Sequence, residues 1–152
     1  MLAPTVHHTS PLRLAPMPKP RLLLVGDSAE RLRSLQAGIN RNEFEITPVC
    51  SLEELRDACR EHHDLAAIDV GPAQIAPMLK ILRTSAEHAE IPLLVESARL
   101  YNDHSLAGVL PSYRAMPCSR TDMLTLMRGH RETLSSSSSS GDYLAHESSR
   151  ML

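Results

Sequence analysis

The chain has 152 residues, a formal net charge of -2 and 42% hydrophobic residues, which is ordinary for a globular protein with a single core. It has no Trp, one Phe and three Tyr, so that core must be aliphatic. The mixed charges give no basic footprint for nucleic acid or an anionic membrane, and no apolar run approaches the roughly 18 residues of a membrane span. We therefore expect neither direct nucleic-acid binding nor membrane insertion.

The two ends of the chain differ in composition from its middle. Residues 1–19 are rich in Pro and unpatterned, which predicts a flexible N-terminal arm without a signal peptide. Six consecutive serines at 135–140 cannot bury apolar surface, so we interpret residues 134–152 as a Ser-rich linker and tail. One domain is expected at 20–133. A linker this close to the last residue suggests an N-terminal piece of a longer protein.

Neither the cysteines nor the histidines form a recognisable metal motif. Cys50, Cys59 and Cys118 lie far apart without a CxxC pair, which favours reduced thiols in a cytoplasmic protein. His62 and His63 are adjacent in sequence, and adjacent residues do not face each other on a helix. No second cluster has the spacing of metal ligands. The sequence predicts no metal site and no cofactor.

Strand-like and helix-like segments alternate along the middle of the chain. Apolar runs predict strands at 21–28, 44–50, 64–70, 91–97 and 109–115. Helical spacing and two capping boxes, which begin at Ser51 and Ser119, predict helices at 29–40, 51–62, 73–83, 101–108 and from 119 onward. Pro48 favours a sheet edge for the second strand.

This alternation predicts an α/β fold, a five-stranded parallel sheet with right-handed crossovers and helices on both faces. The carboxyl ends of such strands form the edge where α/β proteins bind ligands. Asp27, Asp69 and Ser97 each lie at the end of a predicted strand. We therefore expect these three side chains to converge at that edge.

Residues 20 to 131 resemble the receiver domain of bacterial two-component response regulators. The stretch VGDS follows the first strand, where receivers have two acids, and Asp69 falls on their phospho-accepting Asp. Ser97-Ala98 matches the Thr or Ser followed by Ala after the fourth strand, and Pro117 matches the Pro of Lys-Pro after the fifth. The resemblance implies a CheY- or flavodoxin-like sheet with the strand order 2-1-3-4-5.

The sequence departs from the receiver pattern at positions that phosphorylation requires. Mg²⁺ needs oxygen ligands, yet Gly26 replaces the first acid of the receiver pair. Met116 replaces the Lys that stabilises phosphoryl oxygens, and the loop after Asp69 is shorter by about two residues. Phosphoryl transfer depends on positioning and charge neutralisation. We therefore expect Asp69 to be an inactive equivalent of the phospho-acceptor, with Asp27 and Ser97 as the rest of the pocket.

A narrower resemblance is to the N-terminal domain of FleQ-type flagellar master regulators, which is a degenerate receiver. The similar stretches are RLLLVGDS, IPLLVES and VLPSYRAMPCSRTDMLTLMRGH. In that family the domain precedes an AAA+ ATPase and a helix-turn-helix, and this sequence has no GxxxxGK[ST] motif. The resemblance implies a non-catalytic module of flagellar gene control that dimerises or docks on an AAA+ output domain.

Receivers often dimerise through the fourth helix, fifth strand and fifth helix, which by resemblance correspond to about residues 100 to 131. Tyr and Arg are favoured at the centres of protein interfaces. The candidate contact residues are therefore Tyr101, Tyr113, Arg114 and Arg120.

Two alternatives remain open. A stand-alone phosphorylatable receiver would use Asp69 in a two-component relay. A GDSL-type hydrolase would use Ser28 of VGDS as its nucleophile, but Ala29 replaces the Leu of that motif. The spacing of Asp142 and His146 is one residue too long for that family's Asp-x-x-His. Ser28 equally suits the N-cap of the first helix.

Overall fold

The computed structural model describes residues 19–100, 106 and 108–133. Within them, five parallel strands form one sheet in the order β2-β1-β3-β4-β5, which confirms the predicted fold class and order. The strands are β1 (Arg21–Gly26), β2 (Glu45–Val49), β3 (Leu65–Asp69), β4 (Leu93–Glu96) and β5 (Ala115–Cys118). The helices are α2 (Ala29–Ala37), α3 (Leu52–Ala58), α4 (Pro72–Thr84), the 3-10 turn η1 (Ala98–Leu100), α5 (Val109–Ser112) and a last helix at 120–133. None of these described helices is long and apolar enough to span a membrane.

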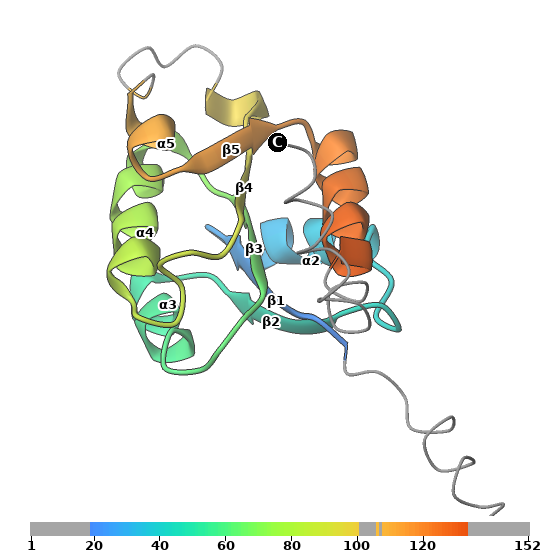
Figure 1. Ribbon diagram of the computed structural model, residues 1–152. Coiled ribbons are helices and arrows are strands. Elements are labelled where there is room, and N and C mark those ends of the chain that lie inside the picture. The colour runs from blue at the N-terminus through green and yellow to red at the C-terminus, as the bar shows by residue number, and fades with distance from the viewer. Residues whose placement is uncertain (1–18, 101–105, 107, 134–152) are drawn as a thin grey trace, which may run out of the picture.

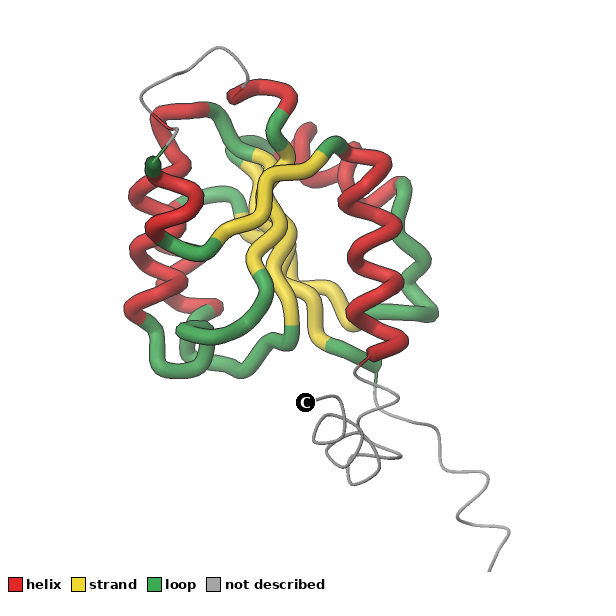
Figure 2. Tube along the Cα trace, turned by 45° about the horizontal axis from the view of Figure 1, so that its top comes forward, coloured by secondary structure: helices red, strands yellow, loops and turns green. Residues whose placement is uncertain are grey.

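The sheet lies between two layers of helices (Figure 2). Helices α3, α4 and α5 cover one face, and α2 and the last helix cover the other (Figure 1). Side chains of β1 alternate between the two layers, since Leu23 and Val25 join the α3–α4 cluster while Leu22 and Leu24 join the α2 cluster. All four are fully buried. A strand buried on both faces explains why its sequence is continuously apolar.

The predicted caps are confirmed. Ser51 Oγ accepts the Glu54 N–H at 3.1 Å, and Glu54 Oε1 in turn accepts the Cys50 N–H at 2.8 Å. Ser119 Oγ accepts the Asp122 N–H at 3.1 Å at the start of the last helix. The bonds to Ser51 and Ser119 each satisfy a main-chain donor of a first helical turn, and the bond to Glu54 satisfies the N–H of Cys50 just before the cap.

The prediction of a fifth strand at 109–115 is wrong. Val109–Ser112 forms the short helix α5, and β5 begins only at Ala115. Between them Arg114 adopts a φ of 55°, a left-handed conformation that turns the chain toward the sheet. Pro111 fits the first turn of a helix, where its missing N–H costs nothing. The predicted helix at 101–108 lies largely outside the described residues.

Arg83, in the last turn of α4, holds this left-handed turn in place. Its guanidinium donates to the carbonyls of Tyr113 at 2.7 Å and Arg114 at 3.1 Å. It also donates to three carbonyls of the loop that enters β4, those of His88, Ala89 and Ile91. One side chain therefore fixes the entrances of both β4 and β5.

A chain of hydrogen bonds passes through two buried histidines. Ser85 Oγ donates to the Cys59 carbonyl at 3.4 Å and so accepts from His88 Nδ1 at 2.9 Å. His88 Nε2 must then accept from His63 Nδ1 at 2.9 Å, which leaves His63 Nε2 to accept the Thr47 hydroxyl at 3.2 Å. Both imidazoles are fully buried, and their neutral forms satisfy every bond of this chain.

We expect the stability of the fold to fall in mild acid through these histidines. Burial lowers the pKa of His63 from 6.5 to about 4 and also lowers the pKa of His88. The unfolded chain therefore binds more protons below about pH 6.5, and stability present above that pH is lost as the pH falls toward 4. Urea unfolding at about pH 5 should show a loss of about 2 kcal/mol through His63 relative to neutral pH, and a further loss through His88.

The variant His63→Gln should reduce this pH dependence, whereas His130→Gln, on the last helix and outside the hydrogen-bonded chain, should retain it. Equal pH dependence in all three proteins would contradict the assignment.

Candidate functional site

Asp69 ends β3 at the carboxyl edge of the sheet, where its neighbour in register on β1 is Gly26. Its side chain is only 1% exposed. Asp27 lies one residue beyond the end of β1 and is partly exposed. A buried carboxylate is strongly destabilising unless cations or hydrogen-bond donors surround it. The partners of Asp69 therefore define the site.

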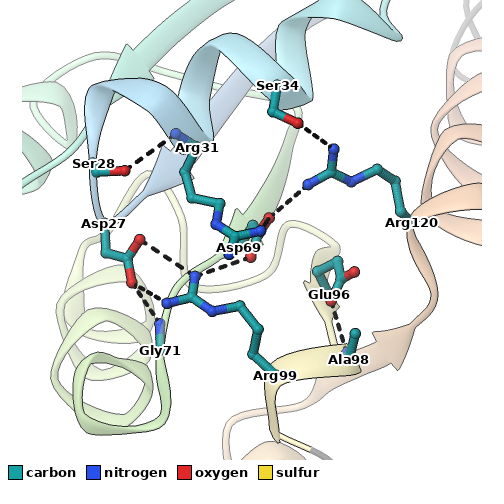
Figure 3. Close-up of polar contacts among 10 residues, drawn as sticks. All are labelled: Asp27, Ser28, Arg31, Ser34, Asp69, Gly71, Glu96, Ala98, Arg99 and Arg120. Atoms are coloured by element: carbon teal, nitrogen blue, oxygen red, sulfur yellow. Dashed lines mark hydrogen bonds and ion pairs between the residues drawn. The ribbon is translucent and has the colours of Figure 1, made fainter.

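Three arginines from separate elements surround Asp69 (Figure 3). Arg120, in the first turn of the last helix, places Nη2 at 2.9 Å from Oδ2. Arg99 of η1 places Nη1 at 3.4 Å from Oδ1, and Arg31 of α2 places Nη1 at 3.6 Å from Oδ2. The carboxylate is thus held by guanidinium groups on several sides.

Arg99 also joins Asp69 to Asp27. Its Nη2 lies 2.6 Å from Asp27 Oδ2, and its Nη1 donates to Asp27 Oδ1 at 3.3 Å. The Gly71 N–H donates to the same Oδ2 at 2.9 Å. The hydrogen bond from Arg99 lowers the pKa of Asp27, and the same bond raises the pKa of Arg99. Asp27 is consequently held as a carboxylate by a cation that belongs to the chain.

Two glycines make room for this arrangement. A Cβ on Gly26 would lie 3.1 Å from the Leu32 side chain and 3.4 Å from Arg31 Cβ. A second acid at this position would therefore require the Leu32 side chain on α2 to shift by a few tenths of an ångström. A Cβ on Gly71 would lie 3.1 Å from Arg99 Nη2, so that glycine allows the guanidinium to reach Asp27.

Neither Ser97 nor Met116 forms a hydrogen bond with Asp27 or Asp69 in the part of the chain that the structure describes. The Ser97 hydroxyl donates to the Cys118 carbonyl at 3.2 Å. Met116 of β5 is in register with Leu94 of β4, which is in register with Ala67 of β3, two residues before Asp69. Met116 is 48% exposed. Arg120 lies four residues after Met116 in sequence, and its guanidinium is the cation that contacts Asp69 Oδ2.

The four interface candidates occupy different environments. Tyr101 lies outside the described residues. Tyr113 is half-buried against the α3–α4 cluster. Arg114 is exposed, and its Nη2 donates to the Ala89 carbonyl at 2.6 Å. Arg120 points into the acidic site and donates through Nη1 to Ser34 Oγ at 2.7 Å.

The residues at this edge do not fit the Mg²⁺ ion that receivers use. The cation would need several oxygen ligands, but Asp27 and Asp69 already share the Arg99 guanidinium. In the part of the chain that the structure describes, no group of three or more His, Cys, Asp or Glu side chains could hold a metal. Asp27 and Asp69 are therefore neutralised by arginine in this arrangement.

Ser28 has the role of a helix cap. Its Oγ accepts the Arg31 N–H at 3.1 Å at the N-terminus of α2. Asp142 and His146, the partners that a GDSL-type hydrolase would require, lie outside the described residues.

Comparison with known proteins agrees with the geometry of the sheet. No family model matches the chain. The chain is 30% identical over 127 residues to the transcriptional regulatory protein PrrA of Mycobacterium tuberculosis. This match covers 77% of the chain and 54% of PrrA. PrrA of Mycobacterium leprae is 30% identical over 91 residues, 59% of the chain and 39% of that protein. The chain thus spans about half the length of the curated relatives it matches.

The chemotaxis response regulator CheY4 of Vibrio cholerae has the same fold, with a TM-score of 0.59 over 74% of this chain and 99% of CheY4, at 14% identity. The similarity to PrrA and the shared fold together support the identification of this chain as a response-regulator receiver domain. At the carboxyl edge of this sheet, Asp27 and Asp69 lie among three arginines.

We expect Arg120 to stabilise the receiver fold through Asp69. Arg120→Met removes the shortest ion-pair partner of a buried carboxylate and should lower the free energy of unfolding by about 2 kcal/mol. In an Asp69→Asn background the same change should cost about 1 kcal/mol less, as a double-mutant cycle in urea would measure.

Arg128→Met is the matched control, because Arg128 lies on the same helix with an exposed side chain and only a 3.8 Å ion pair to Glu43. It should change stability by less than about 1 kcal/mol. Equal losses for the two substitutions, without coupling to Asp69, would contradict the role of Arg120.

Proposed function

We propose that this chain is a phosphorylation-independent pseudo-receiver, a non-catalytic regulatory module of a bacterial transcription regulator. The observation that carries the proposal is the occupation of both edge carboxylates by arginine. Receiver domains are generally regulatory rather than enzymatic, which agrees with a module that works through its surface.

The chemistry of Asp69 supports this proposal. A carboxylate that attacks a phosphodonor needs an accessible oxygen and a cation that can neutralise the incoming phosphoryl group. Asp69 is almost fully buried, and Oδ2 already bonds to Arg120 while Oδ1 faces Arg99. Attack would require these guanidinium groups to move first. The built-in cations therefore favour a fixed site over a reactive one.

The finer role follows the resemblance to FleQ-type regulators. The curated relatives are transcriptional regulatory proteins, and the chain matches about half of their length. We infer that the module controls flagellar genes in the cytoplasm by dimerising or by docking on an AAA+ output domain. A phosphorylatable receiver that uses Asp69 is the runner-up, because the acid itself is retained at the end of β3.

The surface around β5 suits the proposed contact. β5 is an outer strand of the sheet, and Met116 on it is the exposed large hydrophobic residue of the described chain. Arg114 lies just before this strand and is also exposed. An apolar side chain beside an arginine is the composition that interface centres favour.

The proposal predicts that Asp69 stays unmodified. After incubation with Mg²⁺ and acetyl phosphate, intact-protein mass spectrometry should show no phosphoryl adduct, because the guanidinium groups shield the carboxylate. CheY4 treated in parallel serves as the control for a competent phosphodonor. An adduct that disappears in Asp69→Asn would instead establish the phosphorylatable receiver.

The proposal also predicts self-association through β5. Light scattering should detect dimers of the unmodified chain, and Met116→Glu should weaken dimerisation by about tenfold or more through the loss of an apolar contact. Asn42→Glu makes the same charge change on an exposed turn before β2 and should leave association unchanged. A chain that remains monomeric at high concentration would leave docking on an output domain as the only mode.

A further inference from the structure

A second polar cluster lies near the amino ends of β3 and β4, at the opposite edge of the sheet from Asp69. We call it the histidine clasp, and it consists of Thr47, His63, Ser85 and His88. His63 lies two residues before β3, and Ser85 and His88 lie between α4 and β4. Both imidazoles are 0% exposed, and their ring centroids are 5.1 Å apart. The clasp therefore joins β2 to the segments that enter β3 and β4.

The hydrogen bonds of the clasp can accommodate one added proton but not two. His63 Nδ1 and His88 Nε2 face each other at 2.9 Å, and one of these nitrogens must lack a hydrogen for the bond to form. A first proton on His63 Nε2 breaks no bond, because the Thr47 hydroxyl, 3.2 Å away, can accept as well as donate. A second proton places an N–H on both facing nitrogens. The two rings must then separate.

No carboxylate in the described residues is placed to compensate a charge on either ring. The side-chain hydrogen bonds of His63 and His88 all lie within the clasp, and neither ring forms an ion pair among those residues. The titratable and charged groups that face the rings from neighbouring segments are Arg21 of β1, Cys59, Glu61 and His62 after α3, Arg83 of α4, and Glu87. Glu61 is itself bonded to Arg21 at 2.8 Å, and Glu87 lies 3.5 Å from His62. Two protons in the clasp would therefore create buried positive charges without a counter-ion.

The carbonyl of His88 connects the clasp to the entrance of β5. Arg83 Nη1 donates to this carbonyl at 3.0 Å. The same guanidinium donates to the carbonyls of Tyr113 at 2.7 Å and Arg114 at 3.1 Å, where the chain makes its left-handed turn into β5. Because the guanidinium is a rigid plane, a displacement of His88 must shift this fork or break its bonds.

We propose that the histidine clasp is an acid-sensitive switch, in which a second proton separates His63 from His88 and releases the entrance of β5. The inference goes beyond the proposed function, because the switch requires neither phosphorylation of Asp69 nor a dimer. It gives the domain an input at the amino edge of its sheet. The output is a changed β5 border, which carries the exposed Met116.

The clasp is closed at neutral pH and opens in mild acid. Burial lowers the pKa of His88 and lowers the pKa of His63 from 6.5 to about 4. In the open clasp both rings are hydrated and take up protons below about pH 6.5. The closed form is therefore fully favoured above that pH and is progressively lost as the pH falls toward 4. Because opening is coupled to more than one proton, the response is steeper than that of a single histidine.

Amide hydrogen exchange of the whole chain between pH 7 and pH 5 tests the switch. Protection factors are compared, because the intrinsic exchange rate also depends on pH. The probes are the N–H groups of His88, bonded to the Ser85 carbonyl at 3.1 Å, and Arg114, bonded to the Pro111 carbonyl at 3.0 Å. We expect both protection factors to fall by about tenfold or more and to lie well below those of β1, which exchanges through global unfolding.

Variants assign the response to the clasp, after circular dichroism has confirmed that each is folded. His63→Gln should remove most of the pH dependence at both probes, whereas His130→Gln, on the last helix, should retain it. Thr47→Val keeps both imidazoles but removes the hydroxyl that holds the first proton, so opening should move to higher pH.

Three results would overturn the switch. Equal protection at the probes and in β1 at every pH would show that the clasp opens only when the whole domain unfolds. The same pH dependence in His63→Gln and the wild type would show that other groups take up the protons. Loss of protection at His88 without loss at Arg114 would show that the β5 entrance is not connected to the clasp.

Discussion

The buried carboxylate of Asp69 determines how three distant segments are arranged. A charge with 1% of its side chain exposed is tolerated only when cations compensate it, and those cations come from α2, η1 and the last helix. The same ion pairs therefore attach α2, η1 and the last helix to the carboxyl edge of the sheet. The site is a structural centre of the domain as well as its candidate regulatory site, and changes in one of these roles will affect the other.

Arg99 connects this centre to the rest of the edge. Its guanidinium lies between two acids that would repel each other if they were left unpaired, and Gly71 leaves the space in which it fits. In a receiver such a pair of acids attracts a divalent cation from solution. Here the cation is covalently part of the chain and cannot be removed by dilution or chelation. A site neutralised by the chain itself is consistent with a module whose output depends on surface contacts.

Hydrophobic periodicity predicted the fold well because each central strand is buried on both faces and each helix has one apolar side. It failed at 109–115, where the left-handed Arg114 and its carbonyl contacts with Arg83 depend on tertiary structure. The positions of Asp27 and Asp69 followed from strand ends, whereas Arg31 and Arg99 were missed. Their distance to the acids is set by helix geometry across 30 or more residues, which local patterns do not encode.

The two prolines of the sheet have a consequence for how copies of the domain can meet. Pro48 of β2 pairs with Leu24 of β1, and Pro117 of β5 pairs with Val95 of β4. Each outer strand therefore lacks one main-chain N–H. A second sheet cannot add to either border through an unbroken ladder of amide bonds. A main-chain ladder added at either border would be interrupted at the proline, which disfavours fibre-like growth of the module by strand addition.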